Sequence, residues 1–277
     1  MKSEGIISPI DSSYWGTPIV TVLKSNGKVR ICGDYRQVNK HLVDVVFPIS
    51  TIDAIFSKLN KGERFTKIDL SQAYNQFELD EESKNILVLN TTKGLYKINR
   101  MPFGISSASA LCQKFISQLF TGMEGVVNFQ DDLLVTANDD ESHLQNLEKV
   151  LTKLEEAGLT VELSQCAFFQ DKVEYLGFEI SKHGLSKLDD KIKAICLAPP
   201  PQNVSELRSF LGMVNYYSKF VPHIATILKP LYDLLKKTVK FQWSDECNNV
   251  FNKIKELISK DITLMHYNPN VPLILTT

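Results

Sequence analysis

Short runs of apolar and β-branched residues recur through the first 180 residues and predict β-strands. The runs TPIVTVL (17–23) and KVRIC (28–32) flank Asn26-Gly27, a pair that favours the positive φ angles of a tight hairpin turn. Similar patterns recur at RFTKIDL (64–70), NILVLN (85–90), GLYKIN (94–99), VVNF (126–129), DLLVT (132–136), TVELS (160–164) and VEYLGFEI (173–180). Strands are therefore expected throughout this part of the chain.

Segments with helical periodicity lie between and after these runs. Residues 51–62 and 139–159 each place apolar side chains on one face, namely Ile52, Ile55, Phe56 and Leu59 in the first and Leu144, Leu147, Leu151 and Leu154 in the second. Another helix is expected to begin among the serines of GISSASALCQKFISQLF (104–120). After three prolines at 199–201, Asn203 and Glu206 form a capping pair that opens a helix over 203–220. A domain boundary is expected between 180 and 202.

Composition narrows the class of protein. With 277 residues, of which 43% are hydrophobic, the chain is long enough to bury a large core. Its 31 basic and 32 acidic residues nearly cancel, so any basic surface for nucleic acid must come from local segregation of charge. The five cysteines show no spacing typical of zinc sites, and no apolar stretch approaches the roughly 20 residues needed to span a bilayer. We therefore expect an intracellular protein without a membrane partner.

Three aspartates stand at predicted strand ends. Asp131 and Asp132 lie between the runs VVNF and DLLVT, and Asp69 ends the run RFTKID. Taken alone, the adjacent pair is also explained by a solvated polar turn. If the three carboxylates converge on one sheet edge, however, they repel one another and a divalent cation relieves the repulsion. Oxygen-only ligands favour Mg²⁺, and two such ions can assist phosphoryl transfer.

Five ordered motifs carry a resemblance to a known family. They are TKIDLSQAYNQF (66–77), NRMPFGISSASA (99–110), NFQDDLLVT (128–136), VEYLGFEIS (173–181) and ELRSFLGMVNYYSKFVP (206–222). In this order they resemble the reverse transcriptase of gypsy-type (Metaviridae) long-terminal-repeat retrotransposon Pol polyproteins. The resemblance implies an α/β (α+β) right-hand polymerase fold with fingers, palm and thumb, in which helices back an antiparallel palm sheet. It implies fingers and palm at 1–180, a thumb-like helical region at 181–240, and the start of a connection or ribonuclease H-like region at 241–277.

The same resemblance assigns the catalytic and nucleotide-binding residues. Phe129–Asp132 matches the aromatic-X-Asp-Asp motif, which implies that Asp69, Asp131 and Asp132 are catalytic and that these three, together with Leu70, bind two Mg²⁺ ions, with Mn²⁺ as an alternative metal. The implied nucleotide-binding residues are Lys28, Arg30, Ala73, Tyr74, Phe103 and Gln130. Among them Tyr74 corresponds to the steric gate against a ribose 2′-hydroxyl, although a core aromatic would fit the same pattern. Lys28 and Arg30 would grip triphosphate oxygens, although solvated charges are also usual on a β-ribbon.

Two further segments are implied to handle the nucleic acid. Tyr175, Leu176 and Gly177 match the primer grip, which holds the growing 3′ end. Arg208, Gly212 and Tyr216 fall at i, i+4 and i+8 of the helix over 203–220 and so share one face, which the family uses to follow the duplex. A mid-helix glycine costs about 1 kcal/mol relative to alanine. Close approach of nucleic acid would explain this glycine, and so would close packing of another helix.

The chain departs from the family pattern in several places, among them Phe129 in place of a more frequent tyrosine. Only four residues precede Gly5, so part of the fingers is expected to be missing. Gly33 stands where relatives carry a β-branched residue, and glycine weakens strand pairing. The final PLILTT (272–277) resembles the first ribonuclease H strand and stops before the aspartate expected next, so no ribonuclease H chemistry is assigned to this sequence.

The predicted function is RNA-directed DNA polymerase, a nucleotidyltransferase that adds deoxynucleotides to a primer 3′ end by two-metal phosphoryl transfer. Expected partners are an RNA or DNA template with its primer and deoxynucleoside triphosphates, and a homodimer is left open. The expected location is cytoplasmic, including a virus-like particle, or nuclear. The alternative is a decayed or domesticated remnant that keeps the fold without catalysis and binds RNA or a protein partner.

Overall fold

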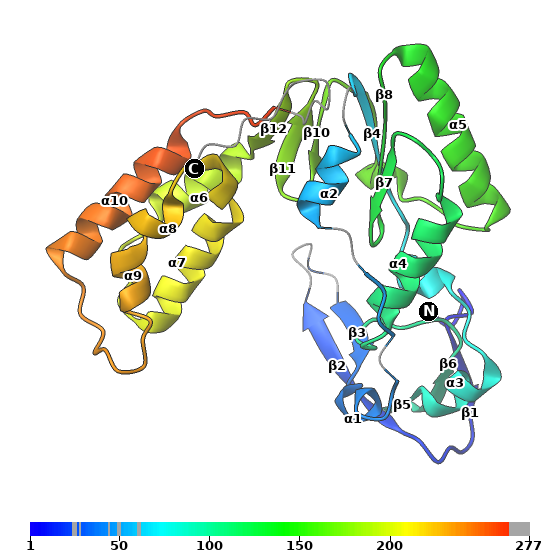
Figure 1. Cartoon of the computed structure of the whole chain (residues 1–277). Coiled ribbons are helices and arrows are strands. Elements are labelled where there is room, and N and C mark those ends of the chain that lie inside the picture. Colours follow the sequence, from blue (N-terminus) through cyan, green and yellow to red (C-terminus); the bar gives the residue numbers. More distant parts are fainter. Residues whose placement is uncertain (24–26, 28, 44, 49–50, 60–61, 266–277) are drawn as a thin grey trace. The chain divides into compact units, whose positions relative to one another are not determined.

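The computed structural model describes residues 1–23, 27, 29–43, 45–48, 51–59 and 62–265. The chain divides into two compact units, Met1–Gln170 and Asp171–Thr277 (Figure 1). The division falls after Gln170, earlier than the boundary expected between 180 and 202. The reason is strand pairing, because the three strands that follow Gln170 form a separate sheet that belongs with the helices after it.

A five-stranded sheet in unit 1 carries the predicted N-terminal hairpin. Its strand order is β1-β6-β5-β2-β3, with β1 Ile7–Ile10, β6 Gly94–Ile98, β5 Val88–Thr91, β2 Thr17–Leu23 and β3 Val29–Gly33. Pairing is antiparallel except between β2 and β5. Short helices α1 (Arg36–Asn39) and α3 (Glu81–Ile86) accompany this sheet, and the sequence pattern did not predict either.

Gly33 has a packing reason that the sequence did not reveal. A Cβ atom at this position would lie 2.4 Å from the ring of Tyr35, which is 2% exposed. Gly104 also lies against this ring. The weaker strand pairing at Gly33 is therefore accompanied by burial of a large aromatic side chain.

A second sheet in unit 1 is four-stranded and antiparallel, with the order β7-β8-β4-β9. The strands are β7 Val126–Phe129, β8 Asp132–Ala137, β4 Arg64–Asp69 and β9 Ala167–Gln170. Ile68, Leu133 and Val135 share one core with side chains of helices α4 (Ala108–Leu119) and α5 (Asp140–Glu156). Since side chains alternate along a strand, Phe65, Lys67 and Asp69 point to the other face.

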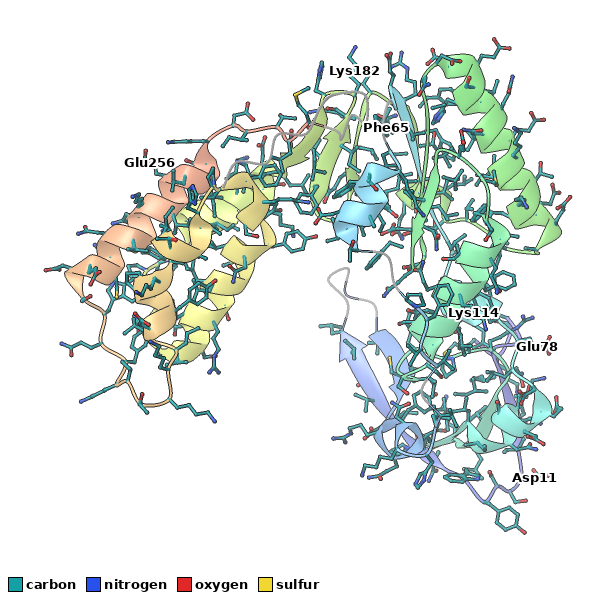
Figure 2. All side chains as sticks on the ribbon, in the orientation of Figure 1. Asp11, Phe65, Glu78, Lys114, Lys182 and Glu256 are labelled. Atoms are coloured by element: carbon teal, nitrogen blue, oxygen red, sulfur yellow. The ribbon has the colours of Figure 1, made fainter. Side chains whose placement is uncertain are left out.

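Side chains on that other face are also packed where they are apolar. Phe65 on β4, labelled in Figure 2, and Leu134 on β8 are both fully buried.

Helix α2 (Ile52–Ser57) is shorter than expected but contributes buried Ile55 and Phe56, as its periodicity predicted. In α5, by contrast, Leu147 and Leu154 are buried whereas Leu144 and Leu151 are 56% and 39% exposed, so half of the predicted stripe faces away from the core.

Unit 2 combines a three-stranded antiparallel sheet with a group of helices. The strands are β10 Lys172–Tyr175, β11 Phe178–Ser181 and β12 Gly184–Lys187. The helices are α6 Asp189–Leu197, α7 Val204–Tyr216, α8 Ile224–Ile227, α9 Lys229–Asp233 and α10 Asp245–Ser259. Since α10 packs against α6 and α9, the described residues after 240 belong to the same unit rather than starting another. Residues 266–277, including the predicted ribonuclease H-like strand, lie outside the described residues.

Local signals at the start of α7 are confirmed. Asn203 caps the helix by accepting from the Glu206 N–H at 3.0 Å, and Glu206 accepts in turn from the Gln202 N–H and the Asn203 amide. Single turns of 3₁₀-helix, η1 (Ala73–Gln76), η2 (Leu163–Gln165) and η3 (Ser218–Phe220), complete the described elements. The second of these replaces the strand predicted at TVELS. Among the helices of the described part of the chain, none has the length and apolar character needed to cross a bilayer.

Candidate active site

The strand register of unit 1 brings two of the three aspartates face to face. Asp69, the last residue of β4, pairs directly with Asp132, the first residue of β8. Directly opposed residues of antiparallel strands project to the same side of the sheet, and here that side is the one opposite α4 and α5. Asp131 lies in the turn that joins β7 to β8, next to this pair. The three predicted carboxylates are thus gathered at one sheet edge.

A strained residue immediately precedes the two adjacent aspartates. Gln130 adopts φ 55°, a left-handed conformation that costs a non-glycine residue roughly 1–2 kcal/mol. Its N–H donates to Oε1 of Gln113 at 2.6 Å, and the Gln113 side chain is 2% exposed within α4. The turn is held on its other side by Leu70, whose N–H donates to the Asp131 carbonyl at 3.3 Å.

Sequence reasoning missed Gln113. A signal was present, because this amide interrupts the buried face that Ala108, Cys112 and Ile116 form on α4. Buried amides need hydrogen-bond partners, so a glutamine on such a face indicates a polar group nearby. Its partner could not be read from the sequence.

Lys67 is a second residue that the sequence reasoning missed. It stands two positions before Asp69 and therefore projects from the same face of β4. Its Nζ lies 3.2 Å from Oδ1 of Asp132, with both side chains about a quarter exposed. This ion pair places a positive charge among the three carboxylates.

The electrostatics of the site reflect crowded negative charge. Burial raises the pKa of Asp69 above its ordinary value, the charges of Asp132 and Asp131 raise it further, and Lys67 lowers it. Burial also raises the pKa of Cys112 to about 12, and Asp131 adds to that shift. The donor set is chemically suited to a hard divalent cation, since it offers carboxylate oxygens whose mutual repulsion a cation would relieve. Among the described residues, however, no three His, Cys, Asp or Glu side chains already stand together as a metal-binding group.

Residues predicted to contact the nucleotide are partly assembled. The rings of Tyr74 and Phe103 meet edge to face with centroids 4.9 Å apart, and the Tyr74 hydroxyl is 2.8 Å from Ser109 Oγ. Tyr74 is half-buried, and burial raises its pKa, with Asp131 among the smaller causes. Ala73 is buried beside it. Lys28 lies outside the described residues, and of Arg30 the structure describes the backbone, which pairs with Val22 in the hairpin.

The predicted primer grip forms the turn between β10 and β11. Leu176 and Gly177 have φ angles of 47° and 70°, and Tyr175 is fully buried. The Tyr216 hydroxyl donates to the Leu176 carbonyl at 2.6 Å, and the Tyr217 hydroxyl donates to the Gly177 carbonyl at 2.9 Å. The end of α7 therefore holds both carbonyl groups of this turn, a link that the sequence did not predict.

The face of α7 predicted to bind the duplex is exposed. Arg208 and Gly212 are exposed, and Tyr216 is 43% exposed. A Cβ atom at Gly212 would meet nothing within 4 Å, so no described residue packs closely at that point. This geometry does not support the alternative that Gly212 allows close packing of another helix within the described chain. Besides its hydrogen bond to the Leu176 carbonyl, Tyr216 stacks its ring on Phe178 at a centroid distance of 5.1 Å.

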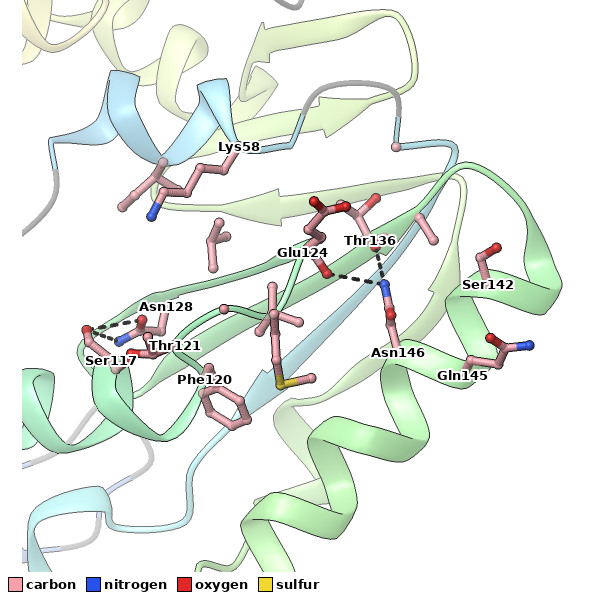
Figure 3. Close-up of a pocket in the computed structure, with 18 of the residues that line it drawn as sticks. Lys58, Ser117, Phe120, Thr121, Glu124, Asn128, Thr136, Ser142, Gln145 and Asn146 are labelled. Atoms are coloured by element: carbon pink, nitrogen blue, oxygen red, sulfur yellow. Dashed lines mark hydrogen bonds between the residues drawn. The ribbon is translucent and has the colours of Figure 1, made fainter.

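A large groove elsewhere in unit 1 is separate from this chemistry. Its volume is about 1080 Å³, and Figure 3 shows it between α2, the end of α4 and the start of α5. Its lining includes none of the predicted site residues. Asn146 bridges one wall by donating to the carbonyls of Glu124 and Thr136, both at 3.3 Å.

Comparisons with known proteins agree with this geometry. Residues 22–180 match the family described as "Reverse transcriptase (RNA-dependent DNA polymerase)". The chain is 33% identical over 284 aligned residues to the "Retrovirus-related Pol polyprotein from transposon 297" of Drosophila melanogaster, covering 100% of this chain and 27% of that protein. It is 30% identical over 262 residues to the "Transposon Tf2-3 polyprotein" of Schizosaccharomyces pombe, covering 94% of this chain and 20% of that protein. The chain thus spans about a quarter or less of these relatives.

Solved structures give the same result for the fold. A foamy viral protease-reverse transcriptase in complex with double-stranded DNA matches with a TM-score of 0.91 and 27% identity, over 97% of this chain and 48% of that one. A foamy viral protease-reverse transcriptase in complex with an RNA/DNA hybrid matches with a TM-score of 0.85 and 27% identity, over 96% of this chain and 36% of that one. The right-hand polymerase fold predicted from the motifs is confirmed.

Proposed function

Because this chain belongs to the reverse transcriptase family, we propose that it is the polymerase part of a retrotransposon Pol polyprotein and extends a primer 3′ end on an RNA or DNA template. The observation that carries the proposal is the register of β4 and β8, which opposes Asp69 and Asp132 and leaves Asp131 in the adjoining turn. Divalent metals are general in this family, and two Mg²⁺ ions, with Mn²⁺ as a substitute, are proposed here. Such ions, when bound, stabilise the attacking and leaving oxygens of phosphoryl transfer.

Each predicted residue has a role in this scheme. Asp69 and Asp131, together with the Leu70 carbonyl, would hold the metals, and Asp132 would support them. The primer 3′ hydroxyl loses its proton to solvent and its oxygen attacks the α-phosphorus of the incoming nucleotide, the bond from that phosphorus to the bridging oxygen of the β-phosphate breaks, and pyrophosphate leaves. Lys28 and Arg30 bind triphosphate oxygens, for which the guanidinium offers two parallel hydrogen bonds.

The remaining site residues select and orient the substrates. Tyr74, supported by the Phe103 ring and Ser109, excludes a ribose 2′-hydroxyl, while Ala73 and Gln130 border the nucleotide. The turn Tyr175–Gly177 holds the primer end. The exposed face of α7 that carries Arg208, Gly212 and Tyr216 binds along the sugar-phosphate backbone of the duplex, which suits an enzyme that copies any sequence. The foamy viral enzymes, matched here in complexes with DNA and with an RNA/DNA hybrid, support this choice of partner.

Primer extension tests the proposal directly. The 277-residue chain is incubated with Mg²⁺, deoxynucleotides and either poly(rA)/oligo(dT) or a DNA template-primer, and Asp131→Asn is compared with Asp11→Asn, which alters an exposed aspartate of the same unit. We expect extension by the wild type and by Asp11→Asn, and loss of extension in Asp131→Asn. Absence of extension by a folded wild-type chain on both templates would favour the non-catalytic remnant. Wild-type extension by Asp131→Asn would remove the carboxylates from the mechanism.

A further inference from the structure

Lys67 lies beside the three aspartates at the ends of β4 and β8, where its positive charge acts on their carboxylates. On β4 it projects from the same face as Asp69, and the register sets it diagonally across from Asp132. The ammonium reaches that carboxylate at 3.2 Å, and Oδ1, the oxygen nearest to it, is shielded from solvent. Partial burial of both partners reduces screening by salt, so this pair is more persistent than a fully exposed one.

The surrounding charges make Lys67 distinctive. Asp69, Asp131, Asp132 and Glu162 all contribute negative charge here, and each of the last three raises the pKa of Asp69. Lys67 is the one group among the causes of that shift, within the described chain, that lowers it. The Lys67 ammonium thus opposes the negative charge of several carboxylates at the site.

The arrangement of the carboxylates is consistent with this opposition. They share one edge, yet within the described ranges they do not form a ready group of three metal ligands. Asp132 instead has a cationic partner in Lys67. A divalent cation that approaches Asp132 must therefore compete with an ammonium that is already in place.

We propose that Lys67 is a positioning residue that holds Asp132 by charge in the nucleotide-free protein, so that divalent cations bind together with a nucleoside triphosphate rather than to the empty site. The inference rests on the proposed function, because it concerns the loading of the same carboxylates. A nucleoside triphosphate carries about four negative charges and brings its own cation. The negative charge that remains on the triphosphate offsets the positive charge of Lys67. Free cations lack that compensation and are repelled by the ammonium.

The test is the affinity of the nucleotide-free protein for Mn²⁺, followed by electron paramagnetic resonance of the unbound ion. Lys67→Met keeps an unbranched side chain and removes the charge, and we expect Mn²⁺ to bind about tenfold more tightly or better, given the strength of Coulomb interactions between partly buried charges. Lys67→Arg restores the positive charge and should bind Mn²⁺ as weakly as the wild type. Lys149→Met, on the exposed face of α5, removes a positive charge away from the site and should change nothing.

Several results would overturn the proposal. Unchanged or weaker Mn²⁺ binding by Lys67→Met would do so, and so would equal tightening by Lys149→Met. If Lys67→Met does not fold, Lys67→Gln removes the same charge and is read by the same titration. A second titration with a non-hydrolysable deoxynucleotide and template-primer should show the wild type approaching the affinity of Lys67→Met, and a persistent gap between them would contradict loading with the nucleotide.

Failure of this inference can be separated from failure of the proposed function. The Mn²⁺ titration reads the ion pair whether or not the chain extends primers. If the wild type extends primers and the affinities of the two proteins are equal, the role of Lys67 alone is rejected. If Lys67→Met binds Mn²⁺ more tightly but no protein extends a primer, the charge effect stands and the polymerase assignment is rejected.

Discussion

Substitution of Gln113 tests whether its hydrogen bond from α4 holds the turn that carries Asp131. Gln113→Met keeps the length of the side chain and removes the acceptor that lies 2.6 Å from the Gln130 N–H. A buried donor left without a partner costs about 1–3 kcal/mol. Gln130 is half-buried and water can reach it in part, so we expect the lower half of this range.

The consequence for activity should exceed the consequence for stability. Once released, Gln130 can leave its strained φ of 55°, and the adjoining Asp131 moves with it. A displacement of about 1 Å at a reacting group costs on the order of 10²-fold in rate. We therefore expect the rate constant for nucleotide addition to fall about ten- to hundredfold, while the melting temperature falls by a few degrees, about what a loss of 1–2 kcal/mol produces in a domain of this size.

Single-turnover primer extension, paired with thermal melting, measures both effects. Ser117→Ala is the matched control, because it removes the other partner of the Gln113 amide and leaves the bond to Gln130 intact. Gln130→Gly combined with Gln113→Met should recover part of the rate, since glycine adopts the left-handed conformation without strain. If Gln113→Met adds nucleotides at the wild-type rate, or loses no more than Ser117→Ala, the turn does not depend on this bond.

Four further predictions concern other parts of the site. Tyr74→Val should lower the ratio of kcat/KM for dGTP over GTP by more than it slows dGTP addition, and an unchanged ratio would return Tyr74 to a core role. Tyr216→Phe keeps the ring and removes the hydroxyl that donates to the Leu176 carbonyl. Hydrogen exchange of the amides in that turn should become faster, and primer extension should slow at unchanged duplex affinity. Weaker duplex binding alone would contradict the role of this hydroxyl in holding the turn. Arg208→Ala should make the salt dependence of duplex binding shallower by about one unit if it contacts phosphate, and wild-type binding at every salt concentration would exclude the contact. The pKa of Asp69 is raised above its ordinary 3.8, so the folded chain holds that proton more tightly than the unfolded chain and loses stability as pH rises from about 4 through the raised pKa. Without added metal, Asp69→Asn should flatten this decline in the free energy of unfolding. Equal slopes of that free energy against pH in the wild type and the variant would refute the prediction.

Local sequence patterns were sufficient to predict the elements that are determined by neighbouring residues. The hairpin of β2 and β3, the capped start of α7 and the helix α5 follow from residues within a few positions of one another. The family motifs added the assignment of the three aspartates; the register of β4 and β8 opposes Asp69 and Asp132, and Asp131 lies in the adjoining turn. Short elements such as α3, β9 and β12 escaped prediction, because four to six residues give too little periodicity to distinguish a strand from a helix or loop.

The partners that shape the site were decided by tertiary structure. Lys67 meets Asp132, Gln113 meets Gln130, and Tyr216 meets Leu176, across separations of many residues. A sequence pattern reports which face of an element is buried, since burial repeats with the period of the element. It does not report which side chain of another element stands opposite, because that depends on strand register and helix packing. The sequence thus determined where the carboxylates would be, and only the folded chain determined which amide, ammonium and hydroxyl groups hold them and the turn at Leu176 and Gly177 in place.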